Sequence, residues 1–145
     1  MKTILYSMMA VAILSLTACS SSPTASKTHS DMEVGTKTGT VKNIVITDTV
    51  TPTALTVHAG DEVRWINQRQ ESVVVAIEGP MDNRVACRKG FSKAMGMGVD
   101  NSTTLASNET AGLCFTRLGT VNYTVRPSSE DKSSMTRSQG SITVQ

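Results

Sequence analysis

The chain has 145 residues, and 14 Lys and Arg side chains against 12 Asp and Glu leave a formal net charge of +2 at pH 7. So small a charge gives no electrostatic basis for binding nucleic acid. Only two Phe, one Trp and two Tyr occur, so a core must be built mainly from Val, Ile and Leu, and together with abundant Thr this composition favours strands.

The first 18 residues predict a secretory signal. Lys2 precedes a short apolar run from Ile4 to Leu14, and a charged start followed by such a run and small residues is typical of signal peptides. The run is too short to cross a bilayer, which needs about 20 apolar residues. The segment Leu16-Thr17-Ala18-Cys19 resembles the lipobox of bacterial lipoproteins. That resemblance implies cleavage before Cys19 and acylation of its thiol and of the new amino terminus.

Lipidation of Cys19 would fix the compartment as the cell envelope. Each buried methylene of an acyl chain adds about 0.8 kcal/mol, so several chains anchor the protein to the membrane. Ser20 stands where inner-membrane retention usually has Asp, so we expect the outer membrane, facing the periplasm. The alternative is an ordinary cleaved signal with a chance cysteine. We predict a signal peptide over 1–18, a lipidated Cys and flexible polar linker over 19–38, and one domain over 39–145.

The domain is predicted to consist of short strands separated by turns. Glu62–Asn67 alternates between polar and apolar residues, whereas Ser72–Ile77 is almost continuously apolar, which indicates burial on both faces. Glu78–Asn101 loses this periodicity and predicts a long loop. Other strands are expected at 41–48, 54–58, 103–106, 111–115, 121–126 and 141–144, with a polar insert at 127–139.

Seven or eight short strands without helical periodicity predict an all-β fold, a Greek-key β-sandwich. We expect the core of this sandwich to contain Val63, Trp65, Val74, Ile77, Leu113 and Val121.

With Cys19 lipidated, Cys87 and Cys114 remain as an even pair in an oxidising compartment. We predict a structural disulfide between them, which would stabilise the fold by about 3–4 kcal/mol in the chain-entropy model. A reactive or metal-binding pair is the alternative. It is less favoured because no His lies near either residue in the sequence and the spacing is not Cys-x-x-Cys.

Two stretches resemble the cupredoxins, the family of plastocyanin and azurin. In Pro52–Asn67 a Gly-Asp turn leads to a strand ending in Trp-x-Asn, similar to a strand pair of that family. Leu118–Tyr123 is similar to the family's approach to the copper loop, and Gly140–Val144 to its closing strand. The resemblance implies a cupredoxin-like fold over about residues 40–145.

The copper ligands of that family do not carry over. A type 1 copper centre needs two imidazoles, one thiolate and a weak axial ligand, usually Met. The first His should fall within Arg69–Val73, the Cys at Val125 and the second His within Arg126–Asp131, but none is present. Met135 alone could replace the axial ligand, so we expect no copper and no other cofactor.

An unconventional copper-binding or electron-transfer site is the alternative function. Thioethers suit Cu(I), and the candidate ligands beside the cysteine pair are Met95, Met97, Met135 and His58. Loop packing for the methionines and a solvent-facing strand position for the histidine are the ordinary explanations.

Four positive side chains, Arg84, Arg88, Lys89 and Lys93, fall within ten residues around Cys87. If the disulfide fixes this segment, they could bind lipopolysaccharide, a cell-wall polymer or an acidic envelope protein; a solvated loop is the ordinary explanation. No hydrolase elbow, zincin helix or phosphate-binding loop occurs, so we expect no enzyme. The sequence predicts a lipid-anchored envelope protein with a copper-free cupredoxin-like domain that acts as a binding or structural module.

Overall fold

The computed structural model describes residues 36–92, 98–129 and 135–145. The predicted signal peptide, Cys19 and most of the linker lie outside the described residues, and the predictions made for them remain predictions. The described residues form ten strands and no helix. In particular, no helix of this part of the chain is long and apolar enough to cross a membrane.

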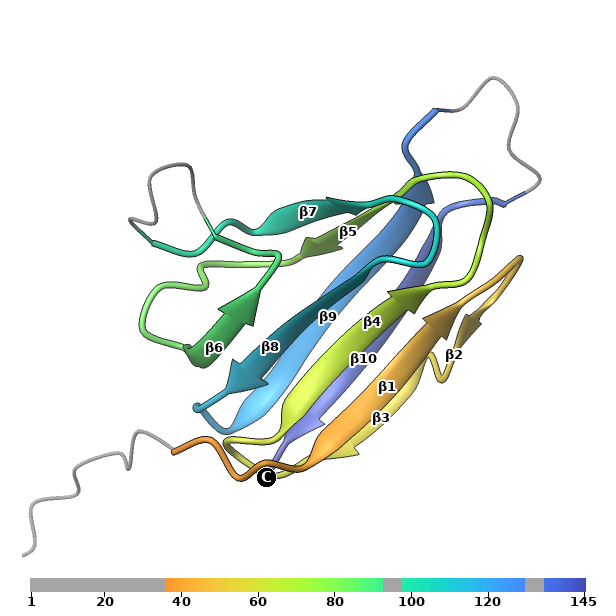
Figure 1. Cartoon of the computed structure of the whole chain (residues 1–145). Helices are drawn as coiled ribbons and strands as arrows, with labels where there is room; N and C mark the ends of the chain where they lie inside the picture. The colour runs from red at the N-terminus through yellow and green to blue at the C-terminus, as the bar shows by residue number, and fades with distance from the viewer. Residues whose placement is uncertain (1–35, 93–97, 130–134) are drawn as a thin grey trace, which may run out of the picture. The chain divides into compact units, whose positions relative to one another are not determined.

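The strands form two sheets of five, which confirms the predicted all-β sandwich (Figure 1). The first sheet has the order β2-β1-β4-β8-β6, where β2 is Val50–Thr51, β1 is Val41–Ile46, β4 is Glu62–Asn67, β8 is Thr110–Phe115 and β6 is Val85–Lys89. The second has the order β3-β10-β9-β5-β7, where β3 is Ala54–Val57, β10 is Ser138–Val144, β9 is Gly119–Pro127, β5 is Val73–Ile77 and β7 is Ser102–Leu105. From β2 to β9 each successive strand lies in the other sheet, so sequence neighbours face one another across the core.

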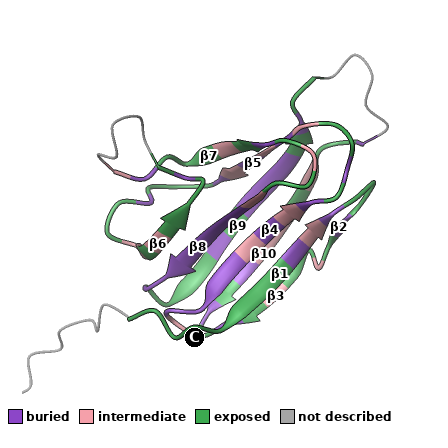
Figure 2. Cartoon of the chain, viewed as in Figure 1, coloured by how far each residue is buried: buried purple, intermediate pink, exposed green. Residues whose placement is uncertain are grey.

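The core lies between the sheets, and strands such as β4 and β5 contribute alternate residues to it (Figure 2). Val63 and Trp65 are fully buried, as predicted. In β5, however, Val73, Val75 and Ile77 face the core while Val74 is only half-buried. The prediction of a core Val74, and of a strand buried on both faces, is wrong because a sandwich covers only one face of each sheet.

The predicted long loop at 78–101 contains a strand instead. β6 pairs with β8 at one edge of the first sheet, and it is one of the two strands, with β2, beyond the eight expected. Its residues are mostly exposed, so it carries no apolar periodicity that would predict a strand. Buried Met81 precedes β6 and buried Phe91 follows it. The Phe91 ring packs edge-on against Trp65, with the ring centroids 5.7 Å apart, and ties the segment to the core.

The described chain begins against the turn between β3 and β4. The amide of Thr38 donates to the carbonyl of Gly60 at 3.1 Å, and its hydroxyl donates to the carboxylate of Asp61 at 2.5 Å. Gly60 has a φ of 92°, and a Cβ there would lie 2.1 Å from the carbonyl oxygen of Thr36, so only glycine fits the turn. Thr38, the last residue of the predicted linker, is therefore fixed to the domain.

Candidate functional site

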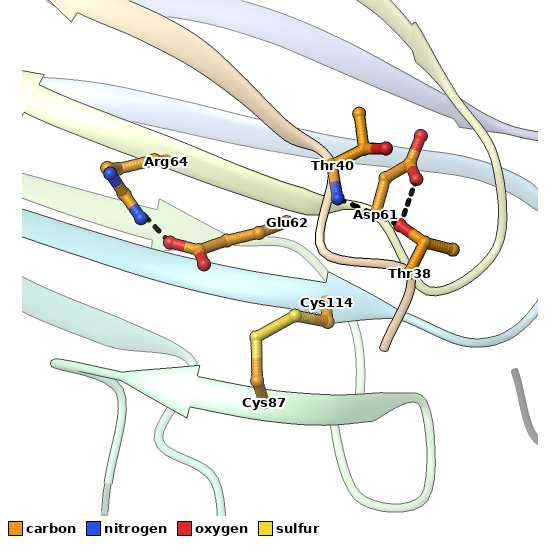
Figure 3. The surroundings of a disulfide bond; sticks show 7 residues. All are labelled: Thr38, Thr40, Asp61, Glu62, Arg64, Cys87 and Cys114. Atoms are coloured by element: carbon orange, nitrogen blue, oxygen red, sulfur yellow. Dashed lines mark hydrogen bonds and ion pairs between the residues drawn. A yellow bond between two sulfur atoms is a disulfide. The ribbon is translucent and has the colours of Figure 1, made fainter. Parts of the chain in front are cut away.

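Three side chains with donor atoms form one row across three neighbouring strands of the first sheet. Glu62 of β4 is paired with Cys114 of β8, which is paired in turn with Cys87 of β6. Val63 and Leu113 beside them are core residues, so by strand alternation the row lies on the opposite, outer face of the sheet. Figure 3 shows the Glu62 side chain and the two cysteines together.

Cys87 and Cys114 form a disulfide, which confirms the predicted bridge. Their Cα atoms are 4.9 Å apart, within the range that a disulfide requires. Cys114 is fully buried and Cys87 half-buried. The bridge joins the edge strand β6 to the sheet just past an irregularity in register between Val85 and Cys87.

The Glu62 carboxylate is held beside this bridge. Only 9% of its side chain is exposed, and the Nε of Arg64 donates to its Oε1 at 2.8 Å (Figure 3). Gly112 of β8 lies beneath it: a Cβ at that position would sit 2.7 Å from Glu62 Oε1. Because Gly112 has no side chain, the carboxylate can lie over β8. The donor atoms of Glu62, Cys87 and Cys114 all lie within 4.8 Å of one another.

The sequence analysis did not connect Glu62 with the cysteines. Glu62 and Cys114 are 52 positions apart in the sequence, and only the register of β4 against β8 brings them together. The pattern Glu-x-Arg in a strand places both side chains on one face, which is the one signal that predicts the Glu62–Arg64 ion pair.

The predicted basic segment is partly described. Arg88 and Lys89 are exposed at the end of β6, and Arg84 is half-buried just before it; Lys93 lies outside the described residues. Arg117, from the loop after β8, joins the same region because its Nε donates to the carbonyl of Asn83 at 3.2 Å. Arg88 and Lys89 are thus on an edge strand rather than on the predicted loop, and Arg84 and Arg117 lie in the loops beside it.

His58 and Met135 do not form a joint metal site. The His58 side chain is 77% exposed, with its Nδ1 3.6 Å from Asp61 Oδ2. His58 follows β3 at the end of the sandwich where β9 begins, whereas Met135 lines a pocket with Pro127, at the far end of β9. At about 3.3 Å per residue, the length of β9 separates the two ends by roughly 26 Å. Met95 and Met97 lie outside the described residues.

Asp61 is a buried carboxylate with a structural role at the β3–β4 turn. The hydroxyl of Thr38 lowers its pKa; burial acts in the opposite direction, and the backbone N–H of His58, 3.0 Å from Oδ2, lowers the pKa further. The net effect is a pKa below the ordinary value. The carboxylate therefore stays charged in the folded protein and holds the first described residues against the turn.

The positions that the cupredoxin resemblance assigns to copper ligands hold no suitable donors. Val125 and Val73 are fully buried apolar residues, and Pro127 pairs with Val73 across β9 and β5. Arg69, also buried, makes ion pairs with Asp48 and Glu71 at this end of the sandwich. Apolar side chains and a paired cation cannot replace imidazole and thiolate, so the residues present do not fit a type 1 copper centre.

Comparisons with known proteins return matches only among solved structures. No family model matches the chain, and no curated protein does. A Met-to-Ala mutant of amicyanin, described in its Cu(I) form, is 18% identical and has a TM-score of 0.45, with 74% of this chain and 83% of that chain covered. A Pro-to-Gly mutant of amicyanin, described in its reduced Cu(I) form at pH 4, is 19% identical with the same TM-score and coverage.

These structures agree with the cupredoxin resemblance at the level of fold. They also correct one expectation: both of these structures are of a protein described in a Cu(I) form, which contradicts the prediction of a domain without a cofactor, so that prediction is wrong. At an identity below 20% and a TM-score of 0.45, they carry no argument about which residues of this chain would bind a metal.

Proposed function

We propose that this chain is a lipid-anchored protein of the bacterial outer membrane, facing the periplasm, whose β-sandwich binds an anionic envelope polymer through the edge strand β6. The lipobox at Leu16-Thr17-Ala18-Cys19 supports the anchor. The observation that carries the binding proposal is the placement of Arg84, Arg88 and Lys89 along one edge of the first sheet.

The backbone that carries the β6 cations is fixed at three points. The Cys87–Cys114 bridge ties the strand to β8, and the buried side chains of Met81 and Phe91 anchor its two flanks. Charges fixed before binding lose less conformational entropy on forming a complex than charges on a mobile loop.

The local charge is strongly unbalanced. Between Met81 and Ser92 the sequence has three cations and a single carboxylate, Asp82. A clustered positive edge attracts polyanions and speeds their association at low salt. Lipopolysaccharide carries phosphate groups of the charge that this edge would attract, and we commit to it as the partner, met by a periplasm-facing protein while it crosses the periplasm.

Binding of the full chain, purified in detergent, to immobilised lipopolysaccharide tests this function. The triple variant Arg84→Gln, Arg88→Gln, Lys89→Gln should bind about tenfold more weakly at low salt, because three charge contacts near the surface, of about 0.5 kcal/mol each, sum to that factor. Wild-type affinity should fall as salt rises.

A matched control neutralises three exposed cations elsewhere, with Lys42→Gln, Arg126→Gln and Arg137→Gln. This variant has the same net charge as the β6 variant and should keep most of the affinity. Equal losses in both variants would reduce the effect to net charge and contradict a site on β6. Affinity that salt does not change would contradict an electrostatic partner altogether.

Mass spectrometry of the amino-terminal peptide tests the anchor separately. We expect the mature chain to begin at Cys19 with acyl chains on its thiol and amino group. An unmodified terminus generated by cleavage elsewhere would contradict the lipoprotein assignment. The proposal of anion binding at β6 would then be tested by the binding measurements alone.

A further inference from the structure

The row of Glu62, Cys114 and Cys87 points to a second site, which shares strand β6 with the proposed anion-binding edge but uses different side chains. We propose that, when the disulfide is reduced, these three side chains bind one thiophilic d10 cation, Zn²⁺ or Cu⁺. The bridge therefore acts as a switch: the oxidised protein has no thiolates to offer, and the reduced protein has two beside a carboxylate.

The chemistry balances with a dithiol as the reductant. The dithiol gives two electrons and two protons to the S–S bond and becomes a disulfide itself, while Cys87 and Cys114 become thiols. Binding of the cation then displaces both thiol protons into solvent and forms two metal–thiolate bonds. Reoxidation of the pair would remove both sulfur ligands at once and release the cation.

The positions of the donors suit a shared cation. In the oxidised protein the donor atoms of the three residues already lie within 4.8 Å of one another. A cation bonded to two sulfurs at about 2.3 Å and a carboxylate oxygen at about 2.0 Å needs separations of less than about 4.6 Å between its ligands, slightly below 4.8 Å, so a small rotation of the Glu62 side chain completes the site. Reduction frees the sulfurs to separate, and β4, β8 and β6 hold the three side chains in one row while they do so.

Two neighbours prepare Glu62 for this role. The Nε of Arg64 donates to Glu62 Oε1 at 2.8 Å, which orients the carboxylate. The second carboxylate oxygen is then available to bind a metal. Gly112 leaves open the space over β8 in which the carboxylate lies, since a Cβ there would come within 2.7 Å of it. Two thiolates, one carboxylate and Zn²⁺ together carry one negative charge, which the Arg64 guanidinium neutralises.

The fold should survive reduction. A bridge between residues 27 positions apart contributes about 3–4 kcal/mol in the chain-entropy model. Domains of this size are typically stable by about 5–15 kcal/mol, and the ring contacts of Trp65 with Phe91 and Tyr123 involve neither cysteine. Cys87 is half-buried on an edge strand, which favours access of a small dithiol to the bridge.

The test uses the full chain in detergent with Cys19→Ser, so that Cys87 and Cys114 are the only cysteines. The protein is prepared oxidised and dithiol-reduced, and each form is titrated anaerobically with Zn²⁺ and, separately, with Cu⁺. Bound metal is measured by elemental analysis after dialysis. We expect one cation per reduced chain and none per oxidised chain, and competition between the two metals then identifies the preferred cation.

Glu62→Gln is the informative variant because it keeps the size of the side chain and an oxygen that can accept from Arg64. We expect it to raise the Kd of the reduced protein at least about tenfold, the smaller effect known for supporting groups around metals. Glu78→Gln, an exposed carboxylate outside the row, is the matched control and should leave the Kd unchanged. Zn²⁺ should also raise the Tm of the reduced protein, and less so in Glu62→Gln.

Several results would overturn the site. A reduced, folded protein that binds neither metal would do so, as would equal binding by the oxidised form. Equal affinity in wild type and Glu62→Gln would remove the carboxylate from the site. If reduction unfolds the protein, added Zn²⁺ must restore the near-ultraviolet circular dichroism of the native state, and failure to restore it overturns the proposal. Lipopolysaccharide binding by the oxidised protein remains an independent readout of the β6 edge.

Discussion

Replacement of Trp65 by alanine should be the most destabilising single change in the β-sandwich. The side chain is fully buried, and its ring lies edge-on to both Phe91 and Tyr123, with ring centroids 5.7 Å apart in each pair. Trp65 thus joins β4 of one sheet to β9 of the other and to the segment that follows β6. Removing it deletes the contact between three separate parts of the fold.

The magnitude follows from the area and the cavity. A buried tryptophan removes about 200 Å² from water, worth about 5 kcal/mol at 25 cal/mol per Å². Measured costs of Trp or Phe to Ala in cores are about 3–5 kcal/mol, because neighbours collapse partly into the space. We expect Trp65→Ala to lower the free energy of unfolding by about 3–5 kcal/mol.

Trp65→Phe provides the graded comparison. The indole Nε1 is buried and has no hydrogen-bond partner among the described residues, and a buried donor without a partner costs about 1–3 kcal/mol. Phenylalanine removes this donor while keeping one ring, so we expect a loss of only about 1–2 kcal/mol. Urea unfolding followed by far-ultraviolet circular dichroism measures both variants, since the chain has a single Trp and fluorescence is lost with it. A loss below 1 kcal/mol in Trp65→Ala would refute the core assignment.

Three further predictions follow from buried groups. Gly140→Ala should cost more than 2 kcal/mol in urea unfolding, because a Cβ there would lie 2.3 Å from the ring of Tyr123, and a cost under 0.5 kcal/mol would contradict that packing. The pKa of Asp61 is lowered in the folded protein. The stabilisation by its carboxylate is therefore present above the unfolded pKa of about 3.9 and is lost as the pH falls through the lower folded value. Asp61→Asn should flatten the curve of unfolding free energy against pH below pH 4, and an unchanged curve would contradict this. Cys87→Ser with Cys114→Ser should lower the unfolding free energy by about 3–4 kcal/mol with native circular dichroism retained, and unfolding of the double variant under native conditions would show that the bridge is indispensable.

The eight strands expected from the sequence are those in which β-branched residues alternate or cluster, and all eight are present. β6 escaped prediction because an edge strand exposes most of its residues and so lacks apolar periodicity. Val74 shows the converse, since a run of three valines hides the alternation that places only Val73 and Val75 in the core.

The disulfide could be predicted because the number of cysteines and the predicted oxidising compartment favour it without any knowledge of register. The neighbouring Glu62 could not, because its pairing with Cys114 depends on how β4 and β8 align. A shift of one residue between these strands would place Glu62 beside Leu113 or Phe115 instead. Sites built across a sheet are therefore harder to predict from sequence than sites built from one contiguous motif.

The order of the first sheet also determines how mechanical force would pass through the molecule. The described chain is fixed at Thr38, just before β1, while the proposed partner contacts β6. Tension between membrane and partner would run across the sheet, from β1 through β4 and β8 to β6. The first links along that path are ladders of hydrogen bonds, but the last is reinforced by the covalent bond between Cys114 and Cys87. Reduction of that bond would leave this last link, like the others, to hydrogen bonds alone.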